Sequence, residues 1–246
     1  GQIQALTSTQ IAGLTTGQVA SLTTSQIEAL TTAQVQALGT NQIASMSSTQ
    51  IAAIQTADLA SLTTGQISGL TTGVIQSLSS AQVAALGTAQ VSTLGTTQLN
   101  ALSSAQVQAI ETADVAALTS AQVSGLTTSS VAALTSSQVK ALGSSQLQAL
   151  SSAQLNALDT ADVAVMGTSQ IQALTSSQVA SLSTDRVTAL TSAQIQALTS
   201  SQVAGLTTGQ VASLTTSQVE ALTTSQIQAL GSSQIAAMSS SQIAAI

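Results

Sequence analysis

Four carboxylates form two pairs and are the side chains with the clearest potential for chemistry. Glu111 with Asp114, and Asp159 with Asp162, lie three residues apart around a Thr-Ala dipeptide. Carboxylate oxygens are ligands that suit Ca²⁺. An aspartate in the first turn of a helix is also stabilised by the helix dipole. Because two carboxylates make a weak cation site, we expect helix capping to be their role, with no bound metal or cofactor, and Ca²⁺ binding as the alternative.

Other residues that could catalyse a reaction are few. The chain has no His and no Cys, and its only basic residues are Lys140 and Arg186. Ser137 lies three residues before Lys140, a spacing that the abundance of Ser explains. Lys140 occupies a variable position, which favours a solvated face. Since a hydroxyl nucleophile needs an activating base, we expect no enzymatic activity and no small-molecule substrate.

These residues belong to an array of thirty octapeptides that runs from Ala5 to Ala244. Counting Ala5 as position one, a typical unit is ALTTAQVQ, residues 29–36. Position two is always Leu, Met or Ile, position seven is Val, Ile or Leu, and position four is Ser or Thr. Position one is mostly Ala, Ser or Gly, and position six is Gln in all but six octads. The two apolar rows predict a core, to which Leu30, Val35 and Leu38 belong.

A short helix in each octad explains this pattern. One straight helix is excluded, because eight residues advance it about 80° beyond two full turns and the apolar rows would spiral. Ser and Thr are favoured N-caps, so we expect caps at position four, and Gly at position three to end the preceding helix. An N-cap at position three is the alternative, because Thr31 and Gln34 have the spacing of a capping box. The predicted position-four caps include Thr32, Ser104, Thr112 and Thr160.

A β-solenoid is the alternative fold, because an even period preserves the alternation of side chains along a strand. Positions two and seven would then point to opposite faces, and Ala, Leu and Gln are poor strand formers. The sequence therefore favours an all-α solenoid, a superhelix with one very short helix per octad. Helices of this length are unstable in isolation, so neighbours along the stack must stabilise them, and we expect neighbouring chains to contribute.

The octads form one continuous array over residues 1–246, and a longer repeat lies above them. Residues 13–54 recur with few changes as residues 205–246, which is an offset of 192 residues. The chain also begins in the middle of an octad. We therefore expect it to be a segment of a longer polypeptide.

Composition excludes several classes of partner. The chain has no aromatic residue and no Pro, only ten charged residues, and a net charge of -6. There is no basic patch for nucleic acid. Polar residues interrupt every octad, so no run of 18 apolar residues is present and we expect no membrane span.

The LTTxQVxAL octads resemble repeat tracts of very large bacterial surface or secreted adhesin-like proteins. This resemblance covers the whole chain and implies an extracellular or cell-surface location. We expect a structural protein that forms a filament, fibre or sheath by stacking and lateral self-association, so that its main partner is itself. A monomeric stalk that presents an adhesin domain outside this segment is the first alternative, and a Ca²⁺-binding solenoid is the second.

Overall fold

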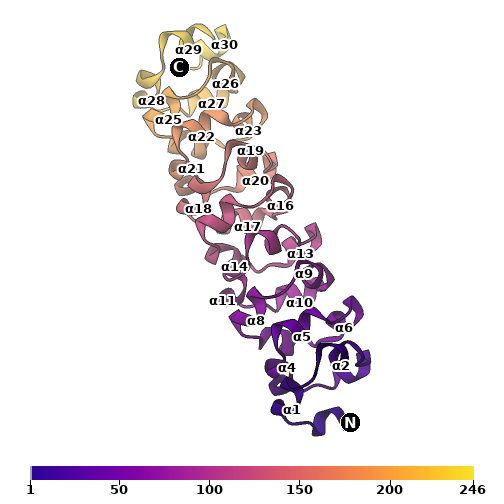
Figure 1. Cartoon of the computed structure of the whole chain (residues 1–246). Helices are drawn as coiled ribbons and strands as arrows, with labels where there is room; N and C mark the ends of the chain where they lie inside the picture. The colour runs from indigo at the N-terminus through magenta and orange to yellow at the C-terminus, as the bar shows by residue number, and fades with distance from the viewer. Residues whose placement is uncertain (1) are drawn as a thin grey trace. The chain divides into compact units, whose positions relative to one another are not determined.

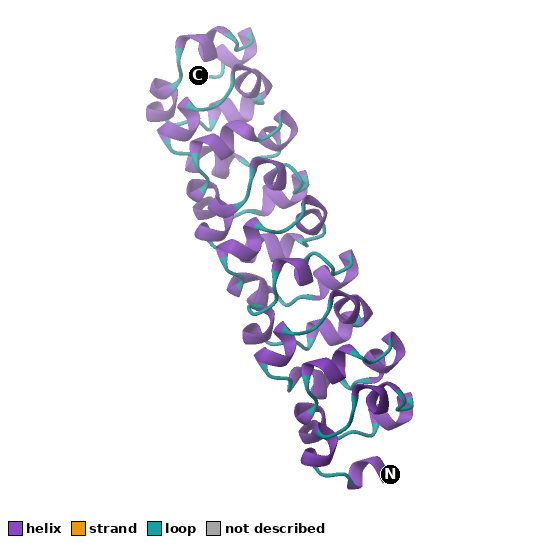
Figure 2. Ribbon diagram, viewed as in Figure 1, coloured by secondary structure: helices purple, strands orange, loops and turns teal. Residues whose placement is uncertain are grey.

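The computed structural model describes residues 2–246, a range in which short helices alternate with loops (Figure 2). It contains one short 3-10 helix and thirty short α-helices, and no strand occurs among the described residues. There is one α-helix per octad, and each begins at position four. The predicted all-α solenoid is therefore confirmed, and the β-solenoid alternative is wrong.

The chain divides into two compact units, residues 1–122 and residues 123–246. The elements of the first unit are η1 (Gln2–Ala5), α1 (Ser8–Ala12), α2 (Thr16–Ala20), α3 (Thr24–Glu28), α4 (Thr32–Ala37), α5 (Thr40–Ala44), α6 (Ser48–Ala53), α7 (Thr56–Ala60), α8 (Thr64–Ser68), α9 (Thr72–Ser77), α10 (Ser80–Ala84), α11 (Thr88–Val91), α12 (Thr96–Leu99), α13 (Ser104–Ala109) and α14 (Thr112–Ala117).

Helix α15 (Ser120–Ser124) contains the division between the units. The elements of the second unit are α16 (Thr128–Ala132), α17 (Ser136–Ala141), α18 (Ser144–Ala149), α19 (Ser152–Leu155), α20 (Thr160–Val165), α21 (Thr168–Ala173), α22 (Ser176–Ser181), α23 (Thr184–Thr188), α24 (Ser192–Ala197), α25 (Ser200–Ala204), α26 (Thr208–Ser213), α27 (Thr216–Glu220), α28 (Thr224–Ala229), α29 (Ser232–Ala236) and α30 (Ser240–Ile243).

Within each unit the helices wind into a stack of coils (Figure 1). The contacts between helices give three helices to a turn. Each helix packs against the third helix after it, as α1 does on α4 and α4 on α7 in the first unit. In the second unit α18 packs on α21 in the same way, and α21 packs on α24. We call one such turn of three helices a coil.

The helices begin one residue earlier in the octad than the predicted caps require. Thr32 is the first helical residue of α4, and its N-cap is Thr31, whose hydroxyl accepts from the Gln34 N–H. The backbone of Thr31 is extended (φ -84°, ψ 157°). That geometry lets a side-chain oxygen reach the free N–H groups of the first turn, whereas a residue already inside the helix points away from them.

The same correction applies to the other predicted caps. Ser104, Thr112 and Thr160 are first helical residues, and the N-caps before them are Ser103, Glu111 and Asp159. The capping-box register, which the sequence left as the other choice, is the one that forms. The Gln34 side-chain oxygen accepts from the Thr31 N–H at 2.9 Å, which completes the box.

Glycine at position three does not end a helix, so that expectation is also wrong. Gly39 and Gly143 are N-caps, with φ values of -73° and -80°. No glycine among the described residues has positive φ. Helix α4 instead ends where the position-two residue Leu38 turns extended, with φ -67° and ψ 131°. Helices such as α3 end one residue earlier, at a position-one residue with helical backbone angles. The extended position-three residue then caps the next helix.

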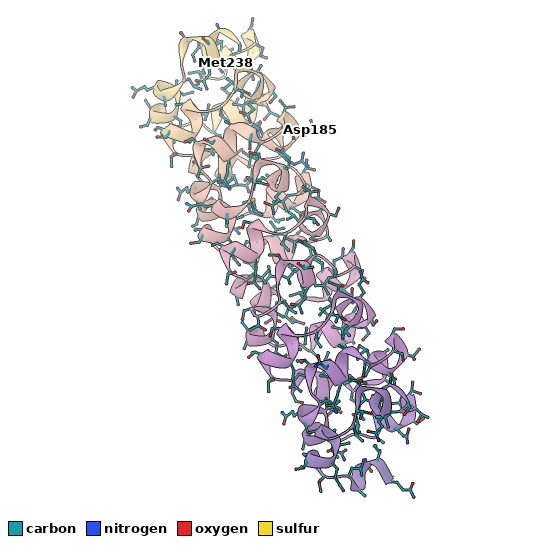
Figure 3. All side chains as sticks on the ribbon, viewed as in Figure 1. Asp185 and Met238 are labelled. Atoms are coloured by element: carbon teal, nitrogen blue, oxygen red, sulfur yellow. The ribbon has the colours of Figure 1, made fainter. Side chains whose placement is uncertain are left out.

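The two apolar rows form the interior of the coils, as predicted. Leu30, Val35 and Leu38 expose 4%, 1% and 2% of their surface. Burial of an aliphatic side chain of this size contributes roughly 1.5–3 kcal/mol. Met46, Met166 and Met238 are buried members of the position-two row (Figure 3 labels Met238).

The small residue at position one allows coils to approach one another. A Cβ atom built on Gly69 would lie 2.7 Å from the Thr40 Cγ2, in the coil below. A Cβ on Gly205 would similarly lie 3.3 Å from the Ser176 Cβ. Position one of a coil therefore packs against position four of the coil that precedes it.

Candidate functional site

Within each unit, glutamines at position six join a coil to the preceding one. Gln82 shows the arrangement: its Oε1 accepts from the Ser79 N–H at 2.8 Å. Its Nε2 donates to the carbonyl oxygens of Ile51 and Ile54, both at 2.8 Å. The side chain is only 1% exposed. One side chain therefore caps its own helix and binds the backbone of the coil below.

These bonds provide partners for the main-chain carbonyls at the ends of the short helices. The last carbonyls of a helix have no partner within that helix, and every octad ends one. Residue Ile54 lies at such an end, and the amide 28 residues later satisfies its carbonyl. Buried main-chain groups are costly when unpaired, so this bond stabilises the end of each helix.

We call these glutamines the amide ladder. Its members share a donor bond at 2.6–2.8 Å from Nε2 to the carbonyl 28 residues earlier, and in most cases a second bond to the carbonyl 31 residues earlier. In the first unit they are Gln34, Gln42, Gln50, Gln66, Gln82, Gln90, Gln98, Gln106 and Gln122. In the second they are Gln154, Gln170, Gln178, Gln194, Gln202, Gln210, Gln218, Gln226, Gln234 and Gln242.

The sequence analysis did not find this role, although the sequence holds a signal for it. Gln stays at position six where position three is Gly, as in Gly39 with Gln42 and Gly95 with Gln98. Glycine has no hydroxyl to complete a capping box. The retained Gln therefore indicates a second partner, and the structure places it in the preceding coil.

Gln10, Gln18 and Gln26 belong to the first coil and differ in one respect. Each accepts from the N–H of its own N-cap at 2.8 Å. Their side chains are exposed, and no described coil precedes them. In these three glutamines the side chain caps its own helix but makes no bond to another coil among the described residues.

Arg186 and Val74, two of the six residues that replace Gln at position six, differ in whether they keep the bond to the preceding coil. Arg186 keeps the ladder bond, since its Nε donates to the Leu158 carbonyl at 2.9 Å and its Nη1 donates to the Ser183 hydroxyl at 2.9 Å. Val74 is buried and has no donor, so only the cap from Thr71 to its backbone N–H remains, at 3.3 Å.

Three aspartates replace the ladder bond with a hydroxyl bond. Asp58, Asp114 and Asp162 are 4–5% exposed, and each accepts from a position-four hydroxyl in the preceding coil. The donors are Thr32 at 2.7 Å, Thr88 at 2.7 Å and Ser136 at 2.8 Å. Thr32 therefore contacts the coil above and is not a cap.

The two carboxylate pairs lie at helix N-termini, where the capping interpretation placed them. Asp159 is the N-cap of α20 and accepts from the Asp162 N–H at 2.7 Å. Glu111 is the N-cap of α14 without a side-chain bond to the helix, and Asp114 lies in the first turn. No group of three or more His, Cys, Asp or Glu side chains within residues 2–246 is arranged to hold a metal.

The surroundings of Asp162 shift the pKa of its carboxyl group. Burial raises its pKa above the ordinary value of 3.8, and the negative charge of Asp159 acts in the same direction. The hydrogen bonds from Ser136 and from the Asp159 backbone lower the pKa without cancelling the effect of burial. Loss of hydration by a buried carboxylate is the dominant cause.

Lys140 projects from α17 as an exposed side chain, as expected of a solvated face residue. It lines a surface hollow together with Ser136, Ser137 and Val165, the last of which is 40% exposed. None of the described helices is both long and apolar enough to cross a membrane.

The fold and the amide ladder define an all-helical solenoid built from octapeptide repeats. The family model for the ALTTAQ repeat matches the chain seven times, at residues 23–53, 51–88, 107–144, 139–167, 155–192, 187–216 and 211–246. The chain therefore belongs to the ALTTAQ repeat family. No curated protein matches it.

Proposed function

We propose that the chain is a structural protein at the bacterial cell surface or outside the cell, and that it assembles into a filament, fibre or sheath. The observation that carries the proposal is the amide ladder. Its bonds run from a side-chain amide to main-chain carbonyls, so each coil offers the next the same groups whatever residues occupy the variable positions. Such an interface suits extension by repetition and does not require a specific ligand.

The outer surface favours contacts between neighbouring copies. Exposed positions three, four and five carry mostly Ser, Thr, Ala and Gly, and few charges are present to keep copies apart. Surface groups of this kind form hydrogen bonds without a large cost of desolvating ions. Lateral association by hydroxyl and amide groups is the second part of the proposed mechanism.

A monomeric stalk is the second candidate, and one observation favours it. The apolar rows are buried within a single chain, as the 0% exposure of Val139 and Leu147 illustrates. No neighbouring chain is needed to complete this core. A stalk would use the same coils as a spacer between other domains, without lateral contacts.

Negative-stain electron microscopy and sedimentation of the purified chain over a range of concentrations distinguish the two candidates. The filament proposal expects uniform fibres whose amount rises with concentration. A paired variant, Ser68→Glu with Ala116→Glu, adds like charges at exposed positions and should reduce assembly at low salt. The matched control, Ser68→Thr with Ala116→Ser, should assemble normally. Particles that stay monomeric at every concentration would reject the filament and leave the stalk.

A further inference from the structure

Asp162 lies in the junction between α17 and α20, at the position where most coils have the side-chain amide of a glutamine. Its Oδ1 accepts from the Ser136 hydroxyl at 2.8 Å, and its Oδ2 accepts from the Asp159 N–H at 3.3 Å. In a regular coil Gln178 also donates, to the Leu150 carbonyl at 2.8 Å. The equivalent carbonyl for Asp162 is that of Leu134, which receives no donor from the described residues. An ionised carboxylate cannot supply one.

The charged groups around this junction do not neutralise the buried carboxylate. Asp159, on the same helix, carries a like charge. On α17 the charged group is Lys140, which is exposed and lies beside the surface hollow. On α23 they are Asp185, which is exposed, and Arg186, which is bound to the Leu158 carbonyl and to Ser183.

We propose that the α17–α20 junction is an acid-strengthened contact, in which protonation changes Asp162 from an acceptor into a donor toward the coil below. The protonated acid keeps an oxygen for the Ser136 hydroxyl and gains an O–H, the counterpart of the glutamine Nε2. The group that this O–H serves is the carbonyl of Leu134. The junction then has a donor toward the coil below, as the regular coils do, in addition to the bond from Ser136.

The pH dependence follows from the direction of the pKa shift. Burial raises the pKa of Asp162 in the folded chain above 3.8, the value expected of the unfolded chain. The folded state therefore binds the proton more tightly, and the contribution of Asp162 to stability is fully present below the unfolded pKa. That contribution is lost as the pH rises through the folded pKa.

Thermal unfolding of the full chain, followed by circular dichroism from about pH 7 to about pH 3.5, tests the proposal with Asp162→Gln and Asp162→Val. Asp162→Gln restores the residue of the regular coils and should melt ~2–4 °C above wild type near neutral pH. The gap should close in acid. Asp162→Val is neutral but has no donor, so acidified wild type should melt above it. The exposed Asp185→Asn is the control, and its melting should track wild type at each pH.

Two results would overturn the proposal. One is a gap between wild type and Asp162→Gln that does not change with pH. The other is acidified wild type that melts with Asp162→Val, since the proton would then remove a charge without adding a hydrogen bond. If the variants fold poorly, the carboxyl ¹³C titration of Asp162 in wild type still decides: a pKa at or below 3.8 would show that the folded chain does not favour the protonated acid.

Discussion

At the scale of single residues, the position-six glutamine is the side chain that combines two roles. Its oxygen caps its own helix and its nitrogen serves a carbonyl 28 residues earlier, so both ends of the amide are used. Glutamate has the same shape and keeps the accepting oxygen, but it lacks the donor. The exchange of Gln for Glu therefore separates the cap from the bond between coils.

Gln82→Glu should destabilise the chain by ~2–4 kcal/mol, because the Ile51 and Ile54 carbonyls lose their donor and a buried carboxylate faces them. The matched control is Gln18→Glu in the first coil, where Gln18 is exposed and caps α2 only. Negative charge near a helix N-terminus is favourable, so this control should leave stability almost unchanged. Urea denaturation of both variants measures the difference, and equal losses would contradict the role of Nε2.

Gly69→Ala should destabilise the chain by ~1–3 kcal/mol, the usual cost of overpacking. The added methyl group would lie 2.7 Å from the Thr40 Cγ2. Gly13→Ala is the control, since a Cβ there approaches only the backbone of its own helix, at 3.4 Å. Adding Thr40→Ser should recover part of the loss. A Gly69→Ala variant as stable as Gly13→Ala would show that the coils are more loosely packed than described.

At the scale of the helix, the boundary between octads depends on which of two adjacent hydroxyls is the N-cap. Ser103 and Ser104 are the same residue type and both are exposed. Only Ser103 accepts from the Gln106 N–H, at 3.3 Å. Sequence alone predicted one helix per octad from these residues, but it placed the cap at position four, because either hydroxyl has a compatible spacing.

Ser103→Ala should cost ~1 kcal/mol, the typical value for a lost N-cap. Ser104→Ala should be neutral or slightly stabilising, because alanine is a better helix former than serine inside a helix. Denaturation midpoints of the two variants give the comparison directly. The opposite order would restore position four as the cap.

At the scale of the whole molecule, the fold depends on equivalence between octads. Each unit stacks coils of three helices, and the partners of the ladder bonds lie 28 residues apart and in most cases also 31 residues apart. Stability in such an array is a sum of local repeat and nearest-neighbour terms. Loss of a whole octad therefore changes which octads pack against one another, but the kinds of side chain and main-chain group at each contact stay the same.

Deletion of residues 201–208, which is one full period of eight residues, should preserve the helical signal per residue and lower the melting temperature only slightly. Deletion of residues 201–204 should be far more damaging, because the apolar and amide positions after it no longer match the coil below. Loss of one buried pair of aliphatic side chains alone amounts to ~3–6 kcal/mol. Circular dichroism spectra and melts of both deletions provide the test, and similar damage from the two would argue against equivalent octads.

The sequence by itself determined the period, the helical class and the two buried rows, because apolar and hydroxyl residues recur at fixed places in every octad. Leu30, Val35 and Leu38 were identifiable from that recurrence alone. Only the tertiary structure decided that Thr31 rather than Thr32 is the cap, that three helices form a turn, and that Gln82 binds Ile54. These features depend on contacts between octads that are nearly identical in sequence, so no local pattern distinguishes one pairing from another. The same holds for Asp162, whose burial comes from the coil that packs against it.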